Sequence, residues 1–340
     1  MVITIKDVAK EANVAPSTVS RVIADNPRIS EKTKKKVREV MDRLGYYPNL
    51  QARSLAAKST QTIGVVFPNS GFNSFQNPFF PIVLQGISTV AHCKKYGMYL
   101  STGATEAEIY EEVISMVQGK RVDGIVLLSS RTDDKTMQYL DEVDFPFTVV
   151  GRPYANEGQI TYVDNDNVFI TKQATKYLID LGHENIAFIG GSKDFVVTLD
   201  RLNGFKQALA EANLQFREEN VVHDIQSTDK GEEVIKSLIT MESPPTALVT
   251  LDDSMAYTLI SHLENLDVRV PEDISIVSFN NYMLSEHLKP PLTSVDISIF
   301  QLGYEATNCL LEKLENPNVL PKRITIPTRL IIRKSCSPNK

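Results

Sequence analysis

Residues 14–22 read VAPSTVSRV and decide the fold of the first part of the chain. Pro16 suits the first position of a helix, where its missing amide proton costs nothing. From there Val19, Val22 and Ile23 recur at helical spacing and form an apolar stripe. The outward face then holds Ser17, Thr18, Ser20 and Arg21. Short hydroxyl side chains and an arginine near a helix N-terminus suit the base edges and phosphates of a DNA major groove. We therefore predict a recognition helix over 16–24.

Two further helices flank this segment. Residues 4–12 place apolar side chains at i, i+3, i+4 and i+7, and Thr4 with Asp7 resembles a capping box. Asn13 tolerates the left-handed conformation that a tight turn between helices needs. A third helix is expected over 31–44, ended by Gly45. The three helices predict a helix-turn-helix DNA-binding domain over residues 1–48.

Residues 49–60 are assigned to a hinge helix and linker. Asn49 can cap a short helix, but a helix of this length is marginal alone in water. Leu55, beside Arg53, has little around it to pack against, which suits a wedge that enters a DNA minor groove and unstacks a base step. The alternative is an ordinary linker helix that packs on the rest of the chain, and the segment taken alone favours that alternative.

Charge is unevenly distributed along the chain. Residues 1–60 carry 12 basic and 6 acidic side chains, a net of +6, whereas the whole chain of 340 residues is −6, so that residues 61–340 carry −12. A basic head on an acidic body indicates that the head meets a polyanion. The alternative is a solvated lysine face on one helix, over 32–38.

The body alternates short apolar strands with amphipathic helices of 12 to 18 residues. The expected strands include 63–67, 124–128, 147–150, 186–189, 247–250 and 274–279, and the expected helices include 82–95, 106–119, 168–181 and 232–241. This alternation is typical of parallel sheets covered on both faces, and so many units indicate two doubly wound subdomains. Ligands of such sheets bind at the carboxyl ends of strands, here in the cleft between the subdomains.

Enzyme and metal signatures are missing from the sequence. There is no dinucleotide fingerprint, P-loop, nucleophile elbow or zinc-protease motif, so we expect neither catalysis nor a cofactor or metal. Gly190-Gly191-Ser192 could hold a phosphate, but we favour a tight connection between strand and helix, which such a fold requires. The three cysteines are interpreted as reduced thiols, and no apolar run is long enough to cross a membrane. With no secretory segment at residues 1–10, a cytoplasmic protein located at the nucleoid is expected.

Polar side chains suited to a neutral ligand follow several strands. They are Arg152, Asp164, Asp252 and Asn280 at or after strand ends, Arg201 in a nearby helix, and Asn73, Phe75, Asn77 and Phe79 in the loop after the first strand. Taken singly, each polar residue can equally be a helix cap. The phenylalanines can stack on a sugar ring or simply pack the rim of the cleft. Converging at strand ends, the set favours a sugar effector.

Four motifs in fixed order resemble the head and hinge of the LacI/GalR family of transcription regulators. They are IKDVA at 5–9, VAPSTVSRV at 14–22, GYYPN at 45–49 and ARSL at 52–55, and the similarity continues to about residue 335. The resemblance implies a homodimer, each head of which reads half of a near-palindromic operator. It places Pro16, Ser17, Thr18 and Arg21 at base-reading positions and makes Leu55 the intercalating hinge leucine. Two departures are Ala15 and Asn13, which stand where many members have serine and glycine.

The resemblance also implies a periplasmic-binding-protein-like body whose chain crosses between subdomains near Tyr162, Pro290 and Pro321. The boundaries expected are 61–161 with 291–320 for the first subdomain, and 162–290 with 321–335 for the second. Arg201, Asp252 and Asn280 take positions that usually touch the effector, although Asn280 departs from a frequent aspartate. Gly151-Arg152-Pro153 and the phenylalanine-rich loop look most like the maltose-operon repressor subgroup.

The function expected is therefore a repressor of carbohydrate-utilisation genes, controlled by maltose or a malto-oligosaccharide. Three alternatives remain. A protein corepressor could replace the sugar. The body alone also fits a sugar-binding protein that feeds a transporter, but the basic head and the missing signal segment oppose that function. An enzyme of sugar metabolism on the same scaffold lacks a nucleophile or metal cluster.

Overall fold

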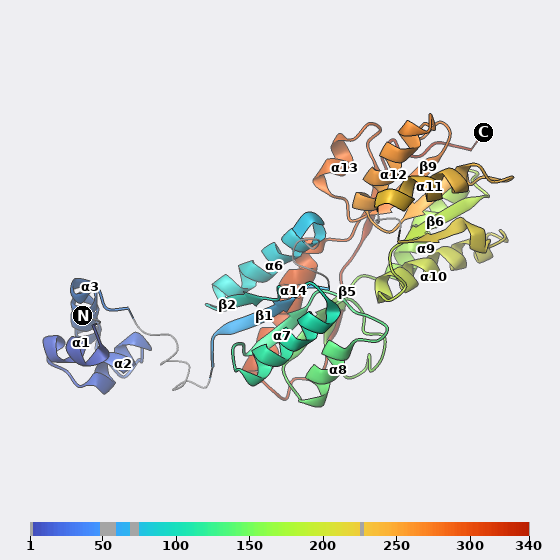
Figure 1. Ribbon diagram of the computed structural model, residues 1–340. Helices are drawn as coiled ribbons and strands as arrows, with labels where there is room; N and C mark the ends of the chain where they lie inside the picture. The colour runs from blue at the N-terminus through green and yellow to red at the C-terminus, as the bar shows by residue number, and fades with distance from the viewer. Residues whose placement is uncertain (1–2, 48–58, 69–74, 225–227, 340) are drawn as a thin grey trace. The chain divides into compact units, whose positions relative to one another are not determined.

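The computed structural model describes residues 3–47, 59–68, 75–224 and 228–339. The chain divides into two compact units, residues 1–60 and 61–340, which are described separately (Figure 1). Within the described residues, no helix is long and apolar enough to cross a bilayer.

The first unit is a bundle of three helices, as expected. They are α1 (Ile5–Ala12), α2 (Pro16–Ile23) and α3 (Glu31–Leu44). Their buried side chains form one small core, made of Val8, Ala9, Ala12, Val19, Val22, Val37 and Val40. The residues expected to begin and end these helices do so. Asn13 and Gly45 end α1 and α3 in the left-handed conformation, with φ of 51° and 63°, and the Ser30 hydroxyl accepts a hydrogen bond from the Thr33 amide at 3.3 Å.

The second unit contains two six-stranded sheets with helices on both faces. The first sheet has the order β11-β5-β4-β3-β1-β2 and is parallel throughout. Its strands are β1 (Thr62–Val66), β2 (Gly97–Leu100), β3 (Gly124–Leu127), β4 (Phe147–Val150), β5 (Tyr162–Asp164) and β11 (Arg323–Thr325). Its helices are α6 (Phe79–Cys93) and α14 (Ile299–Glu315) on one face, with α7 (Glu106–Gln118) and α8 (Lys135–Glu142) on the other (Figure 1).

The second sheet has the order β12-β10-β9-β8-β6-β7. Its strands are β6 (Ile186–Gly190), β7 (Val221–His223), β8 (Ala247–Thr250), β9 (Ser275–Phe279), β10 (Thr293–Asp296) and β12 (Arg329–Ile331). Its helices are α9 (Asn167–Asp180) and α10 (Val196–Glu211) on one face, α11 (Thr228–Ile239) and α12 (Asp253–Asn265) on the other, and the short α13 (Met283–His287) and η1 (Glu218–Asn220). Buried apolar strands between helical layers give each sheet a core on both faces, which is the doubly wound arrangement expected.

The crossings between the subdomains correct the boundaries expected from the sequence. β5 and β11 belong to the first sheet and β10 belongs to the second, each opposite to the expectation. The chain therefore crosses after Asp164, Asp296 and Thr325, a few residues later than Tyr162, Pro290 and Pro321. The resemblance placed the crossings only approximately, because which of two similar sheets a short strand joins is decided by tertiary contacts.

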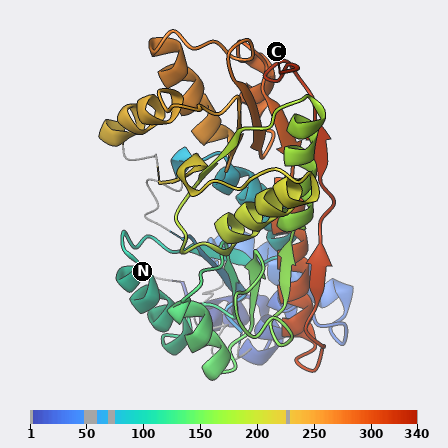
Figure 2. The ribbon, with the colours of Figure 1, turned by 90° about the vertical axis from the view of Figure 1, so that its right-hand side faces the viewer.

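The last strand differs from the parallel pattern. β12 pairs antiparallel with β10, so the second sheet is mixed. Only residues 326–328 separate β11 in the first sheet from β12 in the second, so the chain passes from one sheet to the other over three residues. Figure 2 shows the two strands in red, one after the other along the side of the body.

Candidate DNA-binding and effector-binding sites

The outward face of α2 matches the expected recognition surface. Val19 and Val22 are fully buried, whereas Ser17, Ser20 and Arg21 are exposed and Thr18 is half-buried. Pro16 begins the helix and is exposed. Within the described part of the head, the side chains of Ser17, Ser20 and Arg21 make no hydrogen bond or ion pair. This face of α2 therefore presents donors and acceptors that have no partner among the described residues of the head, from Ser17 in the first turn to Arg21 in the last, an arrangement that a major groove can accommodate.

Thr4 has a local partner. Its backbone N–H and its hydroxyl both donate to the Asp7 carboxylate, at 2.9 and 2.7 Å. These bonds lower the pKa of Asp7, the hydroxyl bond most. Thr4 is exposed beside them, so its expected contact with DNA stays a prediction.

The basic face of α3 is only partly solvated. The Lys34 side chain is 8% exposed, and its Nζ lies 3.0 Å from Asp25 and 2.9 Å from Glu31. Arg38 lies 2.8 Å from the same Asp25 oxygen. The hydrogen bond from Lys34 is the largest cause that lowers the pKa of Asp25. Two of the cations in the predicted lysine face therefore anchor the loop that follows α2.

Four of the predicted site residues lie outside the described residues. They are Asn49, Arg53 and Leu55 of the hinge and Asn73 of the loop after β1. Their roles stay predictions.

The predicted effector residues converge where the two sheets face each other. Asp164 ends β5, Arg152 lies two residues after β4, and Asn280 directly follows β9. Asp252 caps α12, accepting from the Met255 amide at 2.8 Å, so the helix-cap alternative holds for it, while its contact with an effector stays a prediction. Arg201 enters the same region from α10.

One chain of hydrogen bonds joins the two subdomains. Asn77 of the first subdomain donates from Nδ2 to the Asp252 carboxylate at 3.2 Å. Its Oδ1 accepts from the Tyr282 hydroxyl at 2.8 Å. That hydroxyl in turn accepts from Asn280 Nδ2 at 2.7 Å. Amide and hydroxyl groups thus alternate as donors and acceptors, as the hydroxyls of a sugar would require.

A second crossing is ionic. Arg152 of the first subdomain donates from Nε and Nη2 to the Asp200 carboxylate of α10, at 3.1 and 2.7 Å. The Arg152 backbone N–H donates to Asp164 at 2.9 Å. Hydrogen bonding to Asp200 is the largest cause that raises the pKa of Arg152. The two-bond geometry fixes the guanidinium plane at the wall of the cleft.

Arg201 is buried within the second subdomain. It is 4% exposed, and its guanidinium carbon lies 4.1 Å from the centre of the Phe279 ring. Nε donates to the Asn167 side chain at 3.1 Å, and Nη1 donates to the Leu251 carbonyl. Burial lowers the pKa of Arg201 to about 10. Arg201 therefore has a structural role in the second subdomain, and its expected contact with an effector stays a prediction.

Two carboxyl groups in the cleft hold their protons more tightly than in water. Burial raises the pKa of Asp164 to about 6, against backbone hydrogen bonds that lower it. Burial also raises the pKa of Asp252. A cleft that penalises charge in this way favours a neutral ligand over an anionic one.

The phenylalanines of the loop pack largely on one another. The Phe67 ring centre lies 5.3 Å from Phe75 and 5.6 Å from Phe80, and Phe79 meets Phe80 edge-to-face at 5.2 Å. Phe75 remains 50% exposed. Packing of the rim therefore accounts for Phe79 and Phe80, while Phe75 keeps a face free to stack on a ligand.

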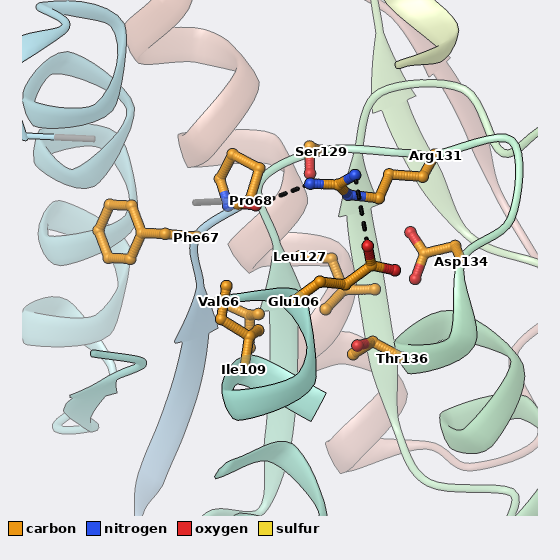
Figure 3. Close-up of a pocket in the computed structure, with 10 residues that line it drawn as sticks. All are labelled: Val66, Phe67, Pro68, Glu106, Ile109, Leu127, Ser129, Arg131, Asp134 and Thr136. Carbon is orange, nitrogen blue, oxygen red and sulfur yellow. Dashed lines mark hydrogen bonds and ion pairs between the residues drawn. The ribbon is translucent and has the colours of Figure 1, made fainter. Parts of the chain in front are cut away.

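A hollow beside the cleft was not predicted (Figure 3). It lies at the carboxyl ends of β1 and β3, lined among others by Leu127, Ser129 and Asp134. Arg131 spans it, donating to the Pro68 carbonyl at 3.1 Å and lying 3.7 Å from Glu106 (Figure 3). Arg131 also stacks on Phe195 of the second subdomain at 4.5 Å. The side chain is thus already paired on several sides, so we assign it no ligand.

Sequence reasoning also missed Tyr282 and Asp200, which make the cross-cleft contacts. Tyr282 comes two residues after Asn280, and Asp200 precedes Arg201, so both were adjacent to chosen positions. Position after the end of β9 could have indicated Tyr282, whereas Asp200 lies within α10 and only its place beside Arg201 pointed to it.

Comparison with known proteins places this architecture in a class. The family description "Bacterial regulatory proteins, lacI family" matches residues 4–49, and "Periplasmic binding protein-like domain" matches residues 175–336. A helix-turn-helix head followed by such a body defines DNA-binding transcription regulators, which are not enzymes.

Relatives narrow the class to one family. The HTH-type transcriptional regulator MalR of Streptococcus pneumoniae is 39% identical over 325 residues, covering 95% of this chain and 96% of its own. A solved structure of the regulator CelR with cellobiose is 31% identical with a TM-score of 0.76, covering 98% of this chain and 99% of its own. A probable maltose operon transcriptional repressor of Staphylococcus aureus is 30% identical with a TM-score of 0.73, covering 82% and 98%. The chain belongs to the LacI family of transcriptional regulators.

Proposed function

We propose that the protein is a homodimeric repressor whose hold on a near-palindromic operator is controlled by maltose or a short malto-oligosaccharide. The observation that carries the effector assignment is the cross-cleft chain of Asn77, Tyr282 and Asn280, made of neutral donors and acceptors. The raised pKa values of Asp164 and Asp252 and the exposed Phe75 ring add support, since sugars combine hydroxyls with apolar faces. The similarity to a maltose operon repressor favours an α-linked glucose oligomer.

In this proposal Pro16, Ser17, Thr18, Ser20 and Arg21 face the major groove, with Thr4 at the backbone. Arg53 and Leu55 follow Asn49 into the minor groove at the operator centre. The DNA target would place the protein in the cytoplasm. Effector binding rearranges the two subdomains across the cleft, which changes the spacing of the hinge segments and thereby the affinity for DNA.

The homodimer is supported by apolar side chains that the single chain leaves exposed. Met98 and Tyr99 are 40% and 37% exposed on β2, the edge strand of the first sheet. On α13 of the second subdomain, Met283 is 83% and Leu284 51% exposed. Exposed apolar groups on both subdomains favour an extended interface with a second copy.

An operator titration tests this function. An operator is first selected from a pool of random palindromes, labelled, and titrated with the full-length protein with and without maltose, maltotriose or cellobiose. We expect maltose or maltotriose to weaken binding about 5- to 150-fold, the range of ordinary coupling free energies. Tighter binding with sugar would make the sugar a corepressor.

Other outcomes would contradict parts of the proposal. A response to cellobiose alone would overturn the choice of sugar. Operator binding that no sugar changes would favour control by a protein corepressor. If no palindrome is bound at low salt, the regulatory function itself is wrong.

A further inference from the structure

A buried carboxylate of the second subdomain lies behind the cleft. Asp253 is the first residue of α12, next to the capping Asp252, and is fully buried. Burial raises its pKa, while hydrogen bonds from Ser285 and Ser294 lower it. Burying a carboxylate costs free energy unless hydrogen-bond donors surround it. The donors around Asp253 therefore indicate which parts of the fold it holds together.

Three donors from one short segment and its neighbouring strand meet this carboxylate. The Tyr282 backbone N–H donates to Oδ2 at 2.9 Å and the Ser285 hydroxyl donates to the same oxygen at 2.5 Å. The Ser294 hydroxyl of β10 donates to Oδ1 at 2.6 Å. A second layer reinforces them, because Tyr257 of α12 bonds to the Ser285 hydroxyl at 2.7 Å. Asp253 therefore holds both ends of the turn that begins α13.

The same turn has one side chain in the cleft and others at the surface. Tyr282 is 3% exposed, and its hydroxyl donates to Asn77 of the opposite subdomain at 2.8 Å. Asn77 Oδ1 also accepts from the Phe79 amide at 3.0 Å, so this contact supports the start of α6. The next residues, Met283 and Leu284, are exposed. With five residues, α13 is too short to be stable by itself, so its position depends on such tertiary contacts.

We propose that Asp253 is a positioning residue that couples the cleft to α13. By fixing the Tyr282 backbone and Ser285 together, it makes the hydroxyl in the cleft and the surface helix move as one piece. Any ligand that displaces the bond between Tyr282 and Asn77 then shifts α13 with its two exposed apolar side chains. The inference rests on the proposed function only in treating the cleft as the effector site.

Hydrogen exchange of the full-length protein without any sugar tests the coupling. In Asp253→Asn, the amide nitrogen must face one of three donors, so at least one loses its acceptor. We expect exchange to rise about fivefold or more both in 283–288 and, across the cleft, in 75–82. Because coupling is reciprocal, Tyr282→Phe, which removes only the hydroxyl, should speed exchange in 283–288 as well as in 75–82.

Two further variants complete the design. Asp180→Asn changes an exposed carboxylate paired with Lys176 in the same subdomain and should alter neither segment. Ser285→Ala removes one donor to Asp253 and should raise exchange in both segments to a smaller extent, which provides the test if Asp253→Asn fails to fold.

If the Asp253 and Ser285 variants loosen 283–288 but leave 75–82 unchanged, Asp253 only stabilises α13 and the coupling is wrong. Unchanged exchange in 75–82 of Tyr282→Phe would likewise overturn it. Because no sugar is present, these results stand apart from the choice of effector.

Discussion

The recognition helix and the cleft treat their functional side chains in opposite ways. On α2, Ser17, Ser20 and Arg21 are exposed and have no partner among the described residues of the head. In the cleft, Arg152 is bound to Asp200 and Arg201 is buried against Phe279. A side chain without a structural partner can be changed at little cost to the fold, whereas a side chain in a satisfied network serves both fold and ligand. Substitutions on the outward face of α2 should therefore change DNA binding without changing stability, whereas substitutions in the cleft should change both ligand binding and stability.

The largest expected effect is that of Arg201→Ala. Removing one member of a buried polar network leaves the others unsatisfied and empties the space on Phe279, so the free energy of unfolding of the body should fall by about 3 to 5 kcal/mol. Urea unfolding followed by tyrosine fluorescence measures it, since the chain has 12 tyrosines and no tryptophan. Lys176→Ala, which breaks an exposed pair, is the control and should cost under about 1 kcal/mol. A loss below about 1 kcal/mol for Arg201→Ala would show that this cleft side chain does not support the fold, contrary to the contrast drawn with α2.

The next largest effect is expected for Arg21→Ala, which should weaken operator binding without changing the stability of the head. Loss of a contact to base edges or phosphate should weaken operator binding by about 1 to 3 kcal/mol, or roughly 5- to 150-fold. Thermal unfolding should be unchanged, because the side chain is exposed and makes no hydrogen bond or ion pair within the described head. Fluorescence anisotropy with labelled operator gives the affinity, and Arg269→Ala on the body surface controls for the lost charge. Equal binding by both variants would remove Arg21 from the interface.

The third effect depends on pH and concerns Asp164. Its pKa is raised from 3.8 to about 6, so its protonated form is favoured in the folded state and the associated stability is lost as pH rises through 6. Asp164→Asn mimics the protonated form. The variant should match the wild type near pH 4 and exceed it near pH 7, by about 1 to 2 kcal/mol in free energy of unfolding. Denaturant titrations at the two pH values measure the difference, and a gap that does not change with pH would show that Asp164 is not held in a charge-penalising cleft.

The smallest effect is expected for Ser17→Ala. One neutral hydrogen bond contributes about 0.5 to 1.5 kcal/mol, so operator affinity should fall up to about tenfold with no change in thermal stability. Binding to a scrambled duplex of the same length supplies the comparison. If both DNAs lose affinity equally, Ser17 contacts the backbone rather than a base.

The same contrast explains which features of the structure could be predicted from the sequence. The ends of the head helices were predictable from Asn13, Ser30 and Gly45 because caps are local chemistry. The six strands expected from apolar runs are present as β1, β3, β4, β6, β8 and β9. The sheet to which β5, β10 and β11 belong was not predictable, since the pairing of strands is decided by tertiary contacts.

In the cleft, Asp252 and Asn280 were predicted because they adjoin strands. Tyr282 and Asp200 escaped prediction, and so did the contacts of Asp253, because all of these depend on partners far along the chain. Tyr282 bonds to Asn77 and Asp253 bonds to Ser294, contacts that no periodicity encodes.

The Asp25 cluster in the head has a consequence for the ionic strength at which the protein works. A cation already held by a carboxylate releases few counterions when it reaches DNA, so Lys34 and Arg38 add little to the polyelectrolyte contribution. Each phosphate that a free lysine or arginine does neutralise steepens the dependence of log K on log salt by about 0.9. The head should therefore depend on salt less than its 12 basic side chains suggest, and more of its affinity for an operator should persist at physiological ionic strength.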